Sequence, residues 1–186
     1  ARTGTLTNSG NIDAALAITL GGNALTNSAE LASEQSVSLT NRAGTAALGG
    51  TVSGKTGVSL TSLGDVSVSG SLVSGTTLGG NVTGTLTNTA TGELLANKAI
   101  TLDATTAINN AGIISTGDAL NFNTPNFIST GTLESGKAFA LTAGSITLSG
   151  RVASTESIML AATNGALDLG AALQGPDITL SWLAGD

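Results

Sequence analysis

The sequence predicts an all-β fold, a parallel β-helix of about nine coils with three short strands in each coil. Three observations lead to this prediction. Apolar residues alternate with polar ones, the alternating stretches recur every 19 to 22 residues, and Gly, Asn, Ser and Asp separate them. Alternation with a period of two is typical of strands, and three strands in a repeat of this length are typical of one β-helical coil.

One series of apolar residues runs through the whole chain in these steps. It consists of Ile18, Val37, Val58, Leu78, Ile100, Leu120, Phe139, Ile158 and Ile178. All but Leu78 have an apolar residue two positions later. We therefore predict a strand at each of the nine positions.

Two further series keep a fixed phase with the first. The second begins about six residues earlier, at Ile12, Leu31, Val52, Leu72, Leu94, Ile114, Leu133, Val152 and Leu173. The third begins earlier again, at Leu6, Leu25, Ala46, Val66, Leu86, Ile108, Ile128, Ile146 and Leu167. An antiparallel sandwich also contains many short strands, but it does not require three series in phase over nine repeats.

The residues between the series fit corners of such coils. Pro125 and Pro176 fall between predicted strands, where a missing N–H is tolerated. Four large apolar residues lie outside the three series: Leu63, Val73, Leu95 and Phe127. We expect these four to occupy a wider part of the core rather than the surface.

The composition excludes several classes of function. The chain has no His, Cys or Tyr, so His-based catalysis, thiol nucleophiles, disulfides and zinc fingers are excluded. The net charge of −6 opposes nucleic-acid binding, which needs clustered Lys and Arg. No apolar run approaches the roughly 18 residues of a membrane helix, and we expect neither a membrane span nor a cofactor.

The tetrapeptide "LTNS" occurs twice, at 6–9 and 25–28, which places Asn8 and Asn27 in the same slot of successive coils. We assign that slot to Asn8, Asn27, Leu48, Val68, Asn88, Asn110, Thr130, Leu148 and Leu169. Because Asn alternates there with apolar residues, it indicates packing rather than catalysis. We predict that Asn8 stacks on Asn27 and Asn88 on Asn110, with amides hydrogen-bonded along the axis.

The corner before the first series carries most of the regularly placed charges. These are Glu34, Lys55, Lys98, Asp118, Lys137 and Glu156, and the last four alternate in sign from coil to coil. They are candidates for a ligand groove. We favour a solvated ridge in which opposite charges pair across coils and discourage sideways sheet pairing.

An enzyme that processes polysaccharides, or a glycan-binding domain like those of phage tails, is the alternative function for a β-helix. Hydrolysis of a sugar needs two carboxylates across one bond. Asp13 and Glu134 each follow a residue of the second series, but they lie six coils apart. With no His and few aromatic residues, we predict no catalytic residue and no metal ligand.

Several repeat units resemble a known family. The units "GTLTNSGNIDA", "ALTNSAELAS", "TLTNTATGELLA" and "AINNAGIISTGDALN" resemble the L-x-N-x-G-x-I/L-x-A/S repeats of filamentous haemagglutinin-like exoproteins. That family includes two-partner secretion adhesins and the stick-like proteins of contact-dependent growth inhibition. The resemblance implies a right-handed β-helix, secretion through an outer-membrane transport partner, and display on the bacterial cell surface. It also implies that some segments bind a host or bacterial receptor.

Two signatures of the family do not occur in this chain. The Asn-Pro-Asn signatures of the secretion domain are absent, since "TPNF" at 124–127 does not match, and so is the Val-Glu-Asn-Asn signature of the toxin region. We therefore expect residues 1–186 to be one β-helical segment from the interior of a longer filament. Its role would be a shaft that supports adhesion or the delivery of a distal toxin.

Overall fold

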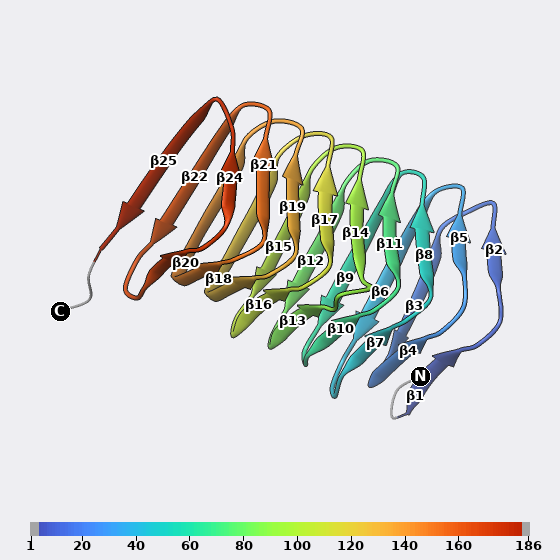
Figure 1. Ribbon diagram of the computed structural model, residues 1–186. Helices are drawn as coiled ribbons and strands as arrows, with labels where there is room; N and C mark the ends of the chain where they lie inside the picture. Colours follow the sequence, from blue (N-terminus) through green and yellow to red (C-terminus); the bar gives the residue numbers. More distant parts are fainter. Residues whose placement is uncertain (1–3, 184–186) are drawn as a thin grey trace.

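Every coil of the chain turns three corners and adds one strand to each of three faces (Figure 1). The structure, a computed structural model, describes residues 4–183, and all regular elements within that range are strands. The coils stack into a rod, with the first and last described coils at opposite ends. No helix of the described range is long and apolar enough to cross a membrane.

Each face is named here by the strand that begins it. Face 1 contains β1 (Thr5–Asn8), β4 (Ala24–Asn27), β7 (Ala46–Leu48), β10 (Val66–Val68), β13 (Thr85–Asn88), β16 (Ala107–Asn110) and β23 (Leu167–Leu169). Face 2 contains β2 (Ile12–Ala14), β5 (Leu31–Ser33), β8 (Thr51–Gly54), β11 (Ser71–Ser74), β14 (Glu93–Ala96), β17 (Ile113–Thr116), β19 (Thr132–Ser135), β21 (Arg151–Ser154) and β24 (Ala172–Gln174).

Face 3 contains β3 (Ile18–Gly22), β6 (Ser36–Asn41), β9 (Gly57–Ser62), β12 (Leu78–Val82), β15 (Ile100–Ala104), β22 (Ser157–Ala162) and β25 (Asp177–Trp182). Two longer strands, β18 (Leu120–Ser129) and β20 (Phe139–Leu148), pass from face 3 into face 1. They join these two faces into a 16-stranded sheet, while face 2 is a separate sheet of nine strands.

All strands pair in parallel, each with the equivalent strand of the next coil. On face 3, Ile18 pairs with Val37, and the register continues unbroken to Ile158 and Ile178. Face 2 likewise keeps the second series in register from Ile12 to Leu173. The predicted β-helix with three strands per coil is therefore confirmed.

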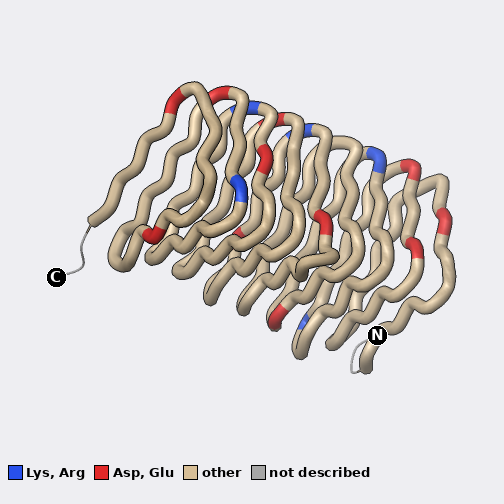
Figure 2. The backbone as a smooth tube through the Cα atoms, in the orientation of Figure 1, with Lys and Arg blue, Asp and Glu red and all other residues tan. Residues whose placement is uncertain are grey.

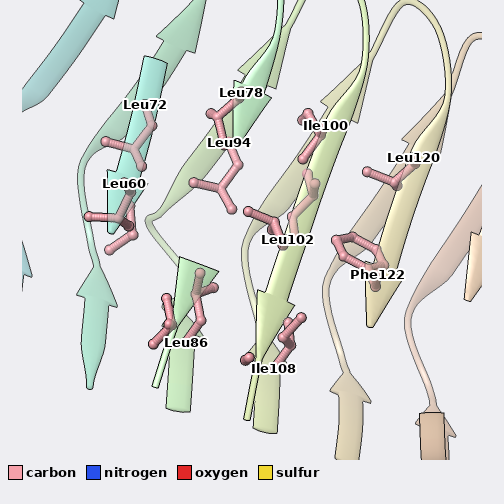
Figure 3. Close-up of a cluster of buried hydrophobic side chains, with 14 of the residues drawn as sticks. Leu60, Leu72, Leu78, Leu86, Leu94, Ile100, Leu102, Ile108, Leu120 and Phe122 are labelled. Atoms are coloured by element: carbon pink, nitrogen blue, oxygen red, sulfur yellow. The ribbon is translucent and has the colours of Figure 1, made fainter. Parts of the chain in front are cut away.

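Stacked aliphatic side chains fill the interior, as Figure 3 shows for the middle coils. On face 2, for example, Leu72, Leu94 and Ile114 belong to this stack, and each is at most 1% exposed. Three phenylalanines also belong to it: the ring centroid of Phe122 lies 4.9 Å from that of Phe127 and 5.9 Å from that of Phe139.

The third series was predicted correctly except in one coil. Phe127, not Ile128, pairs with Ile108 and Ile146, so Phe127 is 1% exposed and Ile128 is 44% exposed. The predicted Asn slot shifts with it, from Thr130 to the buried Ser129. The cause is a corner in β18 that is one residue shorter than the corner of the preceding coil.

The expectation for the four apolar residues outside the series was correct for Phe127 alone. Leu63 lies at a corner and is 60% exposed. Val73 and Leu95 are half-buried neighbours on the outer side of face 2. These three residues therefore contribute apolar area to the surface rather than to the core.

Candidate functional site

The repeated asparagines point inward and pair along the axis of the rod. The Asn8 side-chain amide donates to Asn27 Oδ1 at 2.8 Å, and the Asn88 amide donates to Asn110 Oδ1 at the same distance. The Asn27 amide also donates to the Ala29 carbonyl at 2.8 Å, which closes the corner that follows the strand. These are the two pairs that the sequence predicted. Their side chains bond to one another and to the backbone of the corner, so their role is structural.

Like these asparagines, the other buried polar side chains of the described residues lie next to corners. Every one lies at the last position of a strand or, for Thr124, at the bend inside β18: Asn8, Asn27, Ser33, Asn41, Ser62, Ser74, Asn88, Asn110, Thr116, Thr124, Ser129, Ser135 and Ser154. Ser74, for example, donates to the Thr77 carbonyl at 2.8 Å and accepts from the Thr76 amide. Most of these side chains bond to the backbone of the corner that follows their strand, as Asn27, Asn41 and Ser62 do, so their role is structural.

The six predicted ridge residues all lie at the corner between face 2 and face 3, where Figure 2 shows charges of both signs along the upper edge. They form two columns rather than one. Glu34 and Lys55 precede the first inward residue of face 3 by three positions, and Lys98, Asp118, Lys137 and Glu156 precede it by two.

Opposite charges pair within both columns. Lys55 contacts Glu34, and Lys137 Nζ lies 2.6 Å from Asp118. Asp118 raises the pKa of Lys137 above its ordinary value, first by the hydrogen bond and second by the charge of the carboxylate. Desolvation lowers the pKa of Lys137 by a smaller amount, and the charge of Glu156 raises it by the smallest amount. Since three of the four paired side chains are more than half exposed and that of Asp118 is 34% exposed, the ridge has the properties of a solvated surface.

The structure contains one further ion pair that the sequence analysis does not predict. Arg151 contacts Glu134 across adjacent strands on the outer side of face 2. The signal was present in the register, because Glu134 follows one residue of the second series and Arg151 precedes the next. Arg151 also reaches the side chain of Gln174 in the following coil, at 3.4 Å.

Shallow hollows lie along the outer side of face 2, next to the ridge. One of about 360 Å³ includes Asp13, Glu34 and Lys55, and another of about 370 Å³ includes Glu134 and Arg151. The paired side chain of Glu34 is 59% exposed, so it lacks the burial that a general acid needs. No group of three or more acidic residues in the described range is arranged to hold a metal ion.

A separate hollow of about 530 Å³ lies at the corner between face 3 and face 1. We call it the notch and define it by Asn81, Asp103, Asn123, Thr142 and Asn164. The first four lie on β12, β15, β18 and β20, at successive levels of face 3. These residues were not predicted as a site, because they belong to no apolar series and form no recognisable motif.

The notch exists because the corner is shorter in two coils than in their neighbours. Two residues separate the inward-facing Thr124 from Phe127, and β20 turns in the same number. Three residues make the corner between β15 and β16, and four make the corner between β22 and β23. The longer corners project on either side and leave the shorter ones recessed.

No family model, curated protein or solved structure matches this chain. The fold and the surface chemistry are therefore the basis for a functional proposal.

Proposed function

We propose that this chain is a shaft segment of a secreted filament on a bacterial surface. The observation that carries the proposal is the parallel register, which continues through three faces and nine coils. Each coil contacts only its neighbours, so further coils lengthen such a rod without changing its cross-section. Segments of this kind separate an adhesive or toxic region from the cell that produces it.

The repeat motif supports a secreted location for the shaft. The Asn of the repeat pairs along the axis, as in Asn88 and Asn110, and Gly112, two residues after Asn110, lies at a corner with no space for a side chain. The motif therefore has a structural basis in this chain, in agreement with its resemblance to filamentous haemagglutinin-like exoproteins. In that setting an outer-membrane transport partner exports the chain, and a host or bacterial surface receptor lies at the far end of the filament.

Catalysis is not part of the proposal. The polar side chains in the interior hold corners, and the paired acidic side chains at the ridge and on face 2 are exposed. A shaft requires only that the outer surface stays solvated and that strands do not pair sideways. The alternating ridge charges and the small polar residues of the outer faces meet that requirement.

Immunogold labelling of the producing cell with antibodies against this segment tests the proposal. We expect label on filaments outside the cell, and we expect the label to remain inside when the outer-membrane transport partner is deleted. An antibody against a periplasmic protein of the same cell controls for leakage. Label confined to the cytoplasm of intact cells would contradict the proposal.

A further inference from the structure

The notch presents a row of outward-facing polar side chains at regular spacing. Asn81 pairs with Asp103, Asp103 with Asn123, and Asn123 with Thr142. Neighbouring strands lie about 4.8 Å apart, so the four levels span roughly 14 Å along the rod. Within the described range, none of these four side chains hydrogen-bonds to the protein or joins an ion pair.

The rim of the notch is held in place by hydrogen bonds. The Asn126 amide donates to the Thr106 carbonyl at 3.2 Å, and Asn126 Oδ1 accepts from the Ser145 hydroxyl at 2.8 Å. Asn164 closes one end, where its Oδ1 lies 2.7 Å from the position that a Cβ of Gly144 would occupy. The polar row therefore stands on a fixed backbone, which lowers the entropy cost of binding a ligand.

The chemistry of the lining selects among ligand classes. No Lys or Arg lines the notch, and Asp103 adds a negative charge, so anionic ligands are disfavoured. No large apolar or aromatic side chain lines it either, which disfavours apolar ligands. What remains is a dense set of amide, carboxylate and hydroxyl groups that donate and accept hydrogen bonds.

We propose that the notch binds a neutral saccharide, with two or three sugar units lying along the row from Asn81 to Thr142. Each sugar carries neighbouring hydroxyl groups that both donate and accept, which matches planar amide and carboxylate groups one level apart. The volume of about 530 Å³ falls in the range of small-molecule sites. This binding site does not depend on the shaft role, because it needs only the folded coils around β12 to β22.

NMR titration of the purified chain tests the site. The probes are neutral oligosaccharides of glucose, galactose, mannose and N-acetylglucosamine, and the readout is the side-chain amide signals of Asn81, Asn123 and Asn164. We expect at least one probe to shift these signals. Asn123→Ala should weaken that binding about ten-fold, because hydrogen bonds to the sugar are lost.

The matched control is Asn121→Ala, on the same strand, with the same side chain exposed outside the notch. It should leave the affinity unchanged. A second variant, Asp103→Asn, should retain sugar binding within about three-fold, since an amide also accepts a hydrogen bond. Unchanged circular dichroism in all three variants shows that the fold is intact.

Three results would overturn the proposal. The first is that no oligosaccharide of the panel shifts the notch signals up to its solubility limit. The second is that Asn121→Ala weakens binding as much as Asn123→Ala. The third is that calcium chloride alone shifts the same signals and Asp103→Asn abolishes that response, which would make the notch a cation site. Since the purified chain is used, failure here leaves the cell-surface test of the shaft unaffected.

Discussion

Phe127 shows how one side chain sets the shape of the core. Its ring is tilted by 32° against Phe122, and Phe139 meets Phe122 edge-on at 77°. Such arrangements of aromatic rings are favourable beyond the apolar area that they bury. The cluster lies in the coils of β18 and β20, where its rings occupy space that aliphatic residues fill in other coils.

Replacing Phe127 by Ala should therefore destabilise the protein strongly. We expect a loss of about 3–5 kcal/mol in the free energy of unfolding, because a buried aromatic side chain leaves a cavity. Urea denaturation followed by circular dichroism measures it. The matched variant Ile128→Ala removes an exposed neighbour and should cost less than about 1 kcal/mol. Equal losses in the two variants would mean that the register of β18 is wrong.

The sequence contains the signal for Phe127, although alternation alone favours Ile128 at this position. Counting from Phe127 to Leu133 gives the same six-residue step as most other coils, whereas counting from Ile128 gives five. A fixed step between the third and second series was the better guide. The asparagine pairs could be predicted because Asn8 and Asn27 recur with the period of the coil.

At the scale of the element, two features hold the corners: buried polar side chains bond to them, and the corners of neighbouring coils stack on them. Polar side chains at strand ends bond to the backbone of the corner, and glycines let successive corners stack closely. Gly112 is one example: an added Cβ would overlap the Gly92 and Thr89 carbonyl oxygens. Glycine is therefore needed at position 112 for lack of space rather than for an unusual φ, since Gly44 is the only residue of the described range with a positive φ.

Gly112→Ala should destabilise the rod by about 2–4 kcal/mol, because backbone atoms of the preceding coil must move to admit the methyl group. Gly79→Ala is the matched control: it lies on β12, and no atom lies within 4 Å of the added Cβ. That change should be neutral or slightly stabilising, since it reduces the entropy of the unfolded chain. Thermal denaturation compares the two, and a neutral Gly112→Ala would show that the corners have room to relax.

The ridge gives a prediction on pH. Because the pKa of Lys137 is raised in the folded protein, the contribution of its ion pair to stability is fully present below the unfolded value of about 10.5. It is lost as the pH rises through the folded pKa, so the folded state weakens in the alkaline range. Asp118→Asn should lower the pKa of Lys137 in an NMR titration of its side chain.

A matched change away from the ridge is Asp168→Asn on β23, and it should leave the titration of Lys137 as it is in the original chain. High salt should reduce the difference between the two variants, since the charges are exposed. If Asp118→Asn and Asp168→Asn titrate alike, the pairing of Lys137 with Asp118 does not persist in solution.

At the scale of the molecule, the repeat determines the fold but not the surface chemistry. The period of about 20 residues was sufficient to place strands on three faces, since inward-facing positions must stack. Outward-facing positions obey no such rule. The notch at Asn123 and the ion pair of Glu134 with Arg151 depend on which coils come next to each other. They become visible only when the register is known in every coil.

In a rod where each coil contacts only its neighbours, we expect coils to unfold locally rather than all together. β25 pairs with β22 alone, and all its residues are exposed, whereas β15 pairs on both sides and alternates with buried Ile100 and Leu102. Hydrogen exchange followed by mass spectrometry measures this difference. In the purified chain of residues 1–186, we expect amides of β25 to exchange on the order of 100-fold faster than those of β15, because the coil of β25 is paired on one side only and opens without the rest. Exchange of both strands at one rate would show that the coils of the purified chain unfold as a single cooperative unit.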